Sequence, residues 1–279
     1  MAEKMGEKGK ARHIVLIHGA WQGAWAFAAW LPLLRASGWQ PHAVDLPGNG
    51  WPPQGRQEAS LASYTAHVAA LVERIAAPVI VLGHSGGGIT ASQVAQALPD
   101  RVAGLVYLAG MMLPTGMSFI DLVADVQAGA PEADLAGITP WLVHDAAQDT
   151  TTVRPEGALR CFLHDCEPAA AAHAAALLRP QPESGRAMRN QLSAQHFGRV
   201  PRVYVECRDD RSVLLPLQRR MQQLSPGAAC VSMDCGHVPQ LAQPALLTAL
   251  LLPHLDALLD SHSAGEDAAS LSFPSTLTS

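Results

Sequence analysis

The sequence predicts an α/β fold built on a mostly parallel, doubly wound sheet. Short apolar segments rich in β-branched residues alternate with longer segments of helical periodicity, which is typical of a parallel sheet covered by helices on both faces. The 279 residues are enough for one large domain with a sizeable core. Because 15% of the residues are charged and 48% are hydrophobic, the composition excludes disorder of the main body.

The individual strands and helices follow from this alternation in chain order. Six short runs of Val, Ile, Leu and other apolar residues are predicted to be strands: 14–17, 42–45, 79–82, 105–108, 203–206 and 230–233. Five longer segments with helical spacing of apolar residues are predicted to be helices: 25–35, 63–75, 89–98, 217–224 and 246–258. Gly38 and Pro99 supply stop signals after the first and third of these helices.

The alternation of strand and helix stops between residues 113 and 199. This segment carries Pro, Gly and Ala with helical spacing and no convincing strand, which predicts a helical cap inserted after the fourth strand. An insertion at that point would lie over the carboxyl ends of the strands, where open α/β sheets bind their ligands. We therefore assign the core to residues 12–112 and 200–259, the cap to 113–199, and mobile terminal segments to 1–11 and 260–279.

The charged residues exclude several classes of function. Nineteen basic and 24 acidic residues leave a formal net charge of −5, which does not favour binding of the negatively charged phosphates of nucleic acid. Lys4, Lys8 and Lys10 are the only lysines. A phosphate-binding P-loop, a pyridoxal Schiff base and a Ser-Lys hydrolase each need a lysine in the folded body, so none of them is expected.

Signals for export, membrane insertion and metal binding are missing from the sequence. The first apolar run, 14–17, is too short for a signal peptide, and no stretch approaches the roughly 18 apolar residues of a spanning helix. The five cysteines include no C-x-x-C pair, which favours free thiols in a reducing compartment. The chain also lacks an H-E-x-x-H motif. We therefore expect a cytoplasmic protein with no membrane partner, no metal and no cofactor.

The segment that carries most chemical information is Gly83-His84-Ser85-Gly86-Gly87, which fits the pattern G-x-S-x-G. A predicted strand runs into it and a predicted helix runs out of it, so the serine stands at a sharp turn and is held out of the sheet. The alternative is a tight glycine-rich connection without chemistry. The strand-to-helix context favours Ser85 as a nucleophile.

A serine nucleophile needs a base and an acid. Among the twelve histidines, His237 is the best placed, because it follows the last predicted strand in a glycine-containing loop. The acid should follow a strand and precede the histidine, as Asp209 and Asp210 do after the fifth strand. We prefer Asp210, the alternative for either aspartate being a solvated loop residue or a helix N-cap.

Two backbone N–H groups should bind the carbonyl oxygen that becomes negative during acyl transfer. Gly86, the residue after the nucleophile, is expected to supply one. Ala20, in the small-residue segment His18-Gly19-Ala20-Trp21 after the first strand, is expected to supply the other. The alternative for His18-Gly19 is a plain strand-ending turn.

Together these motifs resemble the α/β-hydrolases grouped with plant methyl-ester esterases of the salicylate-binding type, plant hydroxynitrile lyases and related bacterial esterases. The resemblance spans residues 12–258 and includes the segments 161–166 and 178–180, which look like the family's cap. It implies an α/β-hydrolase fold with a catalytic triad of Ser85, Asp210 and His237. It also implies an oxyanion hole formed by the N–H groups of Ala20 and Gly86.

The lyase branch of this family differs at three positions. The lyases carry Thr, Cys and Lys where this chain has Gly19, Gly86 and Val238, and that Lys is the cation for departing cyanide. Without a lysine there, ester hydrolysis is favoured over cyanohydrin cleavage. The residues expected to line the substrate pocket are Gly19, Trp21, Trp141, Phe162 and Val238.

The sequence thus predicts a cofactor-independent serine esterase, a carboxylic-ester hydrolase that works through an acyl-enzyme. The insertion is rich in Ala, Leu and Met, which favours small to medium apolar esters as substrates. Two alternatives stay open: a hydroxynitrile lyase-like enzyme, and a small-molecule receptor with vestigial hydrolase activity. The residues leave the oligomeric state open, and a homodimer is compatible with them.

Overall fold

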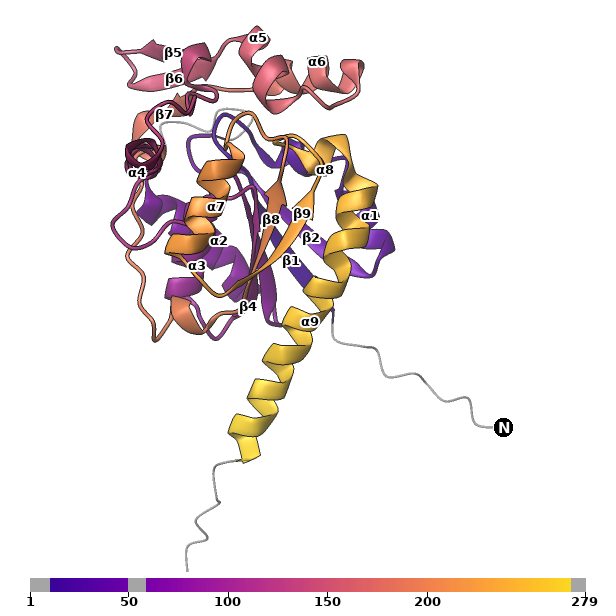
Figure 1. The fold of residues 1–279 in the computed structure, drawn as a ribbon. Helices are drawn as coiled ribbons and strands as arrows, with labels where there is room; N and C mark the ends of the chain where they lie inside the picture. Colours follow the sequence, from indigo (N-terminus) through magenta and orange to yellow (C-terminus); the bar gives the residue numbers. More distant parts are fainter. Residues whose placement is uncertain (1–10, 50–58, 272–279) are drawn as a thin grey trace, which may run out of the picture.

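A six-stranded sheet, in which every neighbouring pair of strands is parallel, organises the fold (Figure 1). The computed structural model describes residues 11–49 and 59–271, with side chains described up to residue 264. The strand order is β2-β1-β3-β4-β8-β9, and all six predicted strands are present. The strands are β1 (Arg12–Ile17), β2 (Trp39–Val44), β3 (Val79–His84), β4 (Val102–Leu108), β8 (Arg202–Cys207) and β9 (Ala228–Met233). The predicted α/β fold with a doubly wound parallel sheet is confirmed.

Side chains on successive strand residues point alternately into two apolar layers, one on each face of the sheet. Val81 and Tyr107 belong to the first layer, whereas Leu82 and Leu108 belong to the second. The first layer is covered by α2 (Leu61–Arg74), α3 (Gly87–Ala97) and α7 (Leu215–Leu224), and the second by α1 (Leu31–Ala36) and α9 (Pro244–Leu271) (Figure 1). Every residue of β3 and β4 is buried, as a sheet covered on both faces requires.

Residues 25–35 were predicted to form one helix, but the structure divides this region into two helices. The structure has a 3-10 helix, η1 (Ala24–Phe27), followed by the separate helix α1. Pro32 lies in the first turn of α1, where its missing N–H costs no hydrogen bond. Deeper inside a helix the same ring would clash with a carbonyl of the preceding turn, so the chain divides here.

The insertion over residues 113–199 contains strands that the sequence did not predict. Besides α4 (Phe119–Gly129) and α6 (Pro168–Leu177), it holds a three-stranded antiparallel sheet of β5 (Leu142–Asp145), β6 (Thr150–Val153) and β7 (Gln181–Pro182). The prediction of a purely helical insertion was therefore wrong. These strands have two to four residues and mostly polar or exposed side chains, so they carry little hydrophobic alternation. The insertion lies over one end of the large sheet (Figure 1).

The C-terminal helix α9 ends at Leu271, beyond the predicted end at residue 258. The prediction of a mobile tail from residue 260 therefore does not describe residues 260–271, which are helical. Of the predicted mobile segments 1–11 and 260–279, residues 1–10 and 272–279 lie outside the described residues.

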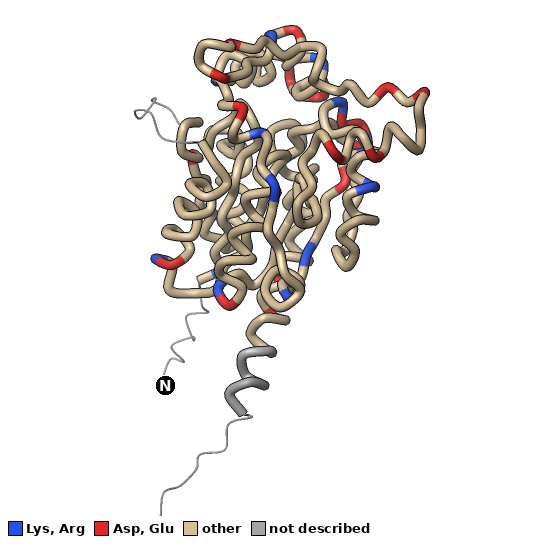
Figure 2. The backbone as a smooth tube through the Cα atoms, turned by 90° about the vertical axis from the view of Figure 1, so that its left-hand side faces the viewer, with Lys and Arg blue, Asp and Glu red and all other residues tan. Residues whose placement is uncertain are grey.

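Charged residues of both signs are intermixed along the chain (Figure 2). Many of them lie in the insertion and at the ends of the sheet rather than along its central strands. Within the ranges that the structure describes, no helix combines the length and the apolar character needed to cross a membrane.

Candidate active site

Ser85 lies at the turn between β3 and α3 in a strained backbone conformation. Its φ is 51°, in the left-handed region that bulky and β-branched residues avoid. The turn is compact, because a Cβ on Gly83 would lie 2.6 Å from the carbonyl oxygen of Gly87 and one on Gly87 would lie 2.5 Å from that of Ile17. Glycine at these two positions allows the approach of neighbouring backbone segments that the motif G-x-S-x-G describes.

Asp210 and His237 form a buried hydrogen-bonded pair. The distance from His237 Nδ1 to Asp210 Oδ2 is 2.7 Å, and the two side chains are 2% and 0% exposed. A carboxylate only accepts, so His237 donates from Nδ1, and this tautomer has Nε2 available as a proton acceptor. The other oxygen, Asp210 Oδ1, accepts from the backbone N–H groups of Ser212 and Val213 at 2.7 and 3.0 Å.

Asp209, the alternative acid, has a different environment. It is exposed, and its backbone N–H donates to the carbonyl of Cys235 at 3.0 Å. Asp210, in contrast, is 3% exposed and directed at the histidine. The structure therefore brings Asp210, and not Asp209, together with His237.

His84 connects the Ser85 turn to the His237 loop, a role that the sequence analysis missed. Its Nε2 lies 2.8 Å from the carbonyl oxygen of His237, and the two imidazole rings are 4.8 Å apart. Burial holds the pKa of His84 well below its usual value, so the ring is neutral near pH 7. Because a carbonyl only accepts, the proton of this neutral ring is on Nε2.

The segment after β1 packs directly against the Ser85 turn. A Cβ on Gly19 would lie 2.7 Å from Ser85 Cβ and 3.2 Å from its Oγ, so glycine is needed for this approach. Gly86 also lies next to Ala20, since a Cβ on Gly86 would be in ordinary van der Waals contact, at 3.8 Å, with the backbone nitrogen of Ala20. Neither the Ala20 N–H nor the Gly86 N–H has a hydrogen-bond partner among the described residues. Two unpaired N–H donors thus lie close together beside the serine.

The imidazole ring of His18 holds this segment through two hydrogen bonds. Its Nδ1 donates to the carbonyl oxygen of Gly19 at 2.8 Å, and its Nε2 accepts from the backbone N–H of Leu46 at 3.1 Å. Burial lowers the pKa of His18, so the neutral ring can perform both roles at once. From the sequence, His18 was placed in the expected oxyanion segment or in a plain strand-ending turn, and no role was predicted for its ring.

A cavity of about 590 Å³ opens beside Ser85. Its wall includes Gly19, Ala20, Trp21 and Gly86, as expected for residues around a nucleophile. Much of the remaining wall is apolar and comes from α3, from the insertion, and from the core segments that carry Met111 and Val213: Ile89, Met111, Phe119, Ile120, Val123, Leu135, Ile138, Met188 and Val213. This volume and lining suit a medium-sized apolar ligand.

Three residues predicted to line the pocket lie elsewhere. Trp141, Phe162 and Val238 do not line this cavity but belong to a separate apolar cluster between the insertion and the core. Phe162 stacks on the His237 ring with 5.3 Å between ring centroids, and Trp141 packs against Gly157. Their apolar character reflects packing, so this part of the pocket prediction is corrected.

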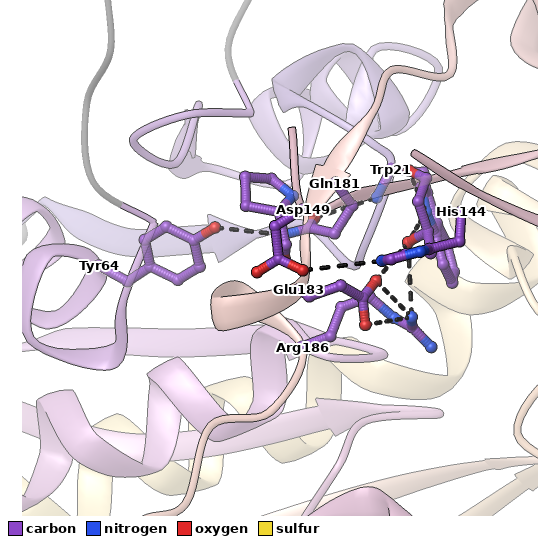
Figure 3. A network of polar contacts seen from close by, with 9 residues as sticks. Trp21, Tyr64, His144, Asp149, Gln181, Glu183 and Arg186 are labelled. Atoms are coloured by element: carbon purple, nitrogen blue, oxygen red, sulfur yellow. Dashed lines mark hydrogen bonds and ion pairs between the residues drawn. The ribbon is translucent and has the colours of Figure 1, made fainter. Parts of the chain in front are cut away.

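One side of the cavity is polar and links the insertion to the core (Figure 3). Gln181 of β7 is hydrogen-bonded to Tyr64 of α2 and to Asn49, and its side-chain oxygen accepts from the backbone N–H of Trp21. Next to it, Arg186 is paired with Glu183 at 2.8 Å. No sequence motif marks these residues, and the segment 181–186 is distant along the chain from Trp21, Asn49 and Tyr64.

The chain belongs to the α/β hydrolase family: the model of this family matches residues 14–250. It is 31% identical over 258 residues to a pyrethroid hydrolase of Sphingobium wenxiniae, covering 88% of each chain. It is 27% identical over 252 residues to salicylic acid-binding protein 2 of Nicotiana tabacum, covering 87% of this chain and 96% of the relative. The crystal structure of a pyrethroid hydrolase from Sphingobium faniae superposes with a TM-score of 0.76 at 29% identity, covering 88% of this chain and 98% of that one. The resemblance to plant and bacterial members of this family is confirmed.

Proposed function

We propose that this protein is a serine carboxylic-ester hydrolase. The observation that carries the proposal is the buried hydrogen bond between His237 and Asp210, which leaves Nε2 of the histidine as the acceptor for a proton. Further support comes from Ser85, which lies on a strained turn next to an apolar cavity and to two N–H groups that have no hydrogen-bond partner among the described residues. A base, a nucleophile and an oxyanion site are the parts that acyl transfer requires.

In the proposed mechanism, His237 Nε2 takes the hydroxyl proton of Ser85 while Oγ attacks the ester carbonyl carbon. The negative oxygen of the tetrahedral intermediate accepts hydrogen bonds from the N–H groups of Ala20 and Gly86, each such donor being worth about 10²–10³ in kcat. His237 then gives the proton to the departing alcohol. In the second half, it deprotonates a water molecule that hydrolyses the acyl-serine, and Asp210 stabilises the imidazolium in both halves.

The proposed substrates are small to medium esters with an apolar acid or alcohol part. The cavity is of the size that binds such molecules and its wall is mainly aliphatic and aromatic. The relative named as a pyrethroid hydrolase supports the assignment of an ester hydrolase with an apolar substrate.

Lyase chemistry is not proposed. At the position where the lyases carry a lysine, this chain has Val238, which is 2% exposed in an apolar cluster. The only lysines of the chain are Lys4, Lys8 and Lys10, which lie outside the described residues. The position after His237, which holds the cation for departing cyanide in the lyases, therefore carries no charge in this chain.

A panel of p-nitrophenyl and alkyl esters, with acid and alcohol parts varied separately, tests the proposal. We expect repeated turnover by the purified protein, none by the Ser85→Ala variant, and negligible cyanide release from mandelonitrile. A single slow turnover together with a large ligand-induced rise in melting temperature would instead identify a receptor. Equal hydrolysis by the Ser85→Ala variant would refute the proposed nucleophile.

A further inference from the structure

Trp21, the residue after the proposed oxyanion donor Ala20, has a backbone conformation that needs external support. Its φ is 62°, which is unfavourable for a bulky side chain. Such a conformation persists where the surroundings hold it in place, and residues of this kind cluster at active sites. The contacts of Trp21 therefore show what holds the Ala20 segment.

Among the residues that the structure describes, the polar contacts of Trp21 all come from the insertion. Its backbone N–H donates to Gln181 Oε1 at 3.3 Å, and its carbonyl oxygen accepts from the backbone N–H of Arg179 at 2.9 Å. Its indole N–H donates to the carbonyl oxygen of Thr151 at 3.1 Å. The guanidinium group of Arg186 lies 5.1 Å from the centre of its ring, as Figure 3 illustrates.

Gln181 lines the cavity, but its amide group has no capacity left for a ligand. Its Oε1 accepts from Trp21 and from Asn49 Nδ2, and its Nε2 donates to the Tyr64 hydroxyl and to the carbonyl oxygen of Pro182, both at 3.3 Å. A glutamine side chain offers two donor hydrogens and two acceptor lone pairs, so all four are used. The residue is 1% exposed. These contacts favour a role in positioning over a role in substrate binding.

We propose that Gln181 is a positioning residue that restrains the Ala20 N–H through Trp21, in addition to the hydrogen bond from His18 to the Gly19 carbonyl of the peptide unit that carries this N–H. This inference rests on the proposed function, in which that N–H binds the oxyanion. The Trp21 N–H belongs to the peptide unit directly after Ala20, so its hydrogen bond to Gln181 restricts the rotation of that unit. The oxyanion site is then completed by the insertion, and its geometry depends on a side chain that does not touch the substrate.

The test compares Gln181→Leu with a matched control, Ser184→Ala. Ser184 lies in the same segment and donates to the core carbonyl of Ala59 at 2.7 Å without touching Trp21. We expect Gln181→Leu to lower kcat by about 10- to 100-fold with KM changed by less than about threefold, because the lost interaction acts on the transition state. The Ser184→Ala variant should retain wild-type kcat.

A second readout separates positioning from a general loss of structure. A trifluoromethyl ketone matched to the ester substrate forms an oxyanion adduct, whereas the corresponding methyl ketone probes ground-state binding. In Gln181→Leu we expect the Ki of the trifluoromethyl ketone to rise by the same factor as kcat falls, and the Ki of the methyl ketone to stay unchanged.

A milder variant, Tyr64→Phe, keeps the inference testable if Gln181→Leu does not fold. It removes the hydroxyl that Gln181 contacts and keeps Gln181 and Trp21 intact, so we expect a smaller loss in the same two quantities. Equal loss in Ser184→Ala, an effect confined to KM, or an unchanged trifluoromethyl ketone Ki would overturn the inference. If the wild-type protein itself hydrolyses no ester, the proposed function fails, and that result is distinct from failure of the variants alone.

Discussion

The carbonyl oxygen of His237 accepts a hydrogen bond from His84 Nε2 at 2.8 Å, although the two residues lie 153 positions apart in the sequence. His84 directly precedes Ser85, so this bond ties the loop that carries the proposed base to the strand that carries the proposed nucleophile. The bond needs a protonated Nε2 on a neutral ring, and burial supplies the neutral form by lowering the pKa of His84.

The buried histidines predict how stability changes with pH. The pKa values of His18 and His84 are lowered in the folded protein and return to about 6.5 on unfolding. Between the lowered and the unfolded pKa values the unfolded chain binds more protons, so stability is complete above about pH 6.5 and falls as the pH drops below it. Each histidine contributes a slope of up to about 1.4 kcal/mol per pH unit.

Melting temperatures measured from pH 5 to pH 8 check this expectation. His84→Gln keeps a donor near the His237 carbonyl and removes one titrating group, so the fall below pH 6.5 should become shallower. The exposed residue His173 supplies the control, because His173→Gln should leave the profile unchanged. An identical profile for all three proteins would show that His84 does not contribute to the dependence.

Replacing Asp210 by Asn should lower kcat by about 10⁴-fold, because the amide no longer holds His237 in the tautomer with Nδ1 protonated. The exposed neighbour provides a matched comparison, and Asp209→Asn should change kcat by less than about threefold. Steady-state kinetics on one chromogenic ester are sufficient. A loss confined to Asp209→Asn would reverse the assignment of the acid.

Asp165, in the insertion, is expected to support the His237 loop. Its Oδ2 accepts from the backbone N–H of Gly236 at 2.6 Å, one residue before the histidine. Asp165→Ala leaves that N–H unpaired, and we expect kcat to fall by about tenfold with little change in KM. Asp165→Asn retains a side-chain acceptor and should preserve most of the activity. Similar kinetics for Asp165→Ala and the wild type would exclude this role.

The cavity predicts where chain-length preference is set. Val123 of α4 lies in the cavity wall, so Val123→Trp should fill space that longer acyl chains need. We expect kcat/KM for a decanoate ester to fall by about 100-fold, while that for the acetate ester, the internal control, changes little. A uniform decrease for both esters would mean that Val123 does not face the bound acyl chain.

The sequence predicted the sheet and the Ser85 turn because both depend on local signals. The two central strands β3 and β4 are fully buried and therefore apolar along the predicted segments 79–82 and 105–108, and glycine is required at Gly83 and Gly87 by close backbone contacts. Residues such as Asp210 could be placed because the order of motifs along the chain is itself informative.

The features that the sequence did not predict depend on contacts between segments that are distant along the chain. The strands of the insertion are short and polar, Phe162 and Val238 pack in a neighbouring cluster and not in the cavity wall, and Gln181 meets Tyr64 across 117 positions of sequence. A hydrophobic pattern cannot distinguish a cavity wall from a packed cluster, since both are lined by apolar side chains. The contacts of His84 and Gln181 also depend on distant segments, so no local sequence pattern could predict them.

Covalent labelling of Ser85 tests the central claim most directly. Diethyl p-nitrophenyl phosphate should inactivate the protein with one diethylphosphoryl group per chain, located by peptide mass mapping on Ser85. The rate of labelling should fall by about 10³-fold or more in His237→Ala, because the hydroxyl then has no base. Complete inactivation with the phosphoryl group on another residue, or an equal labelling rate without His237, would contradict the account.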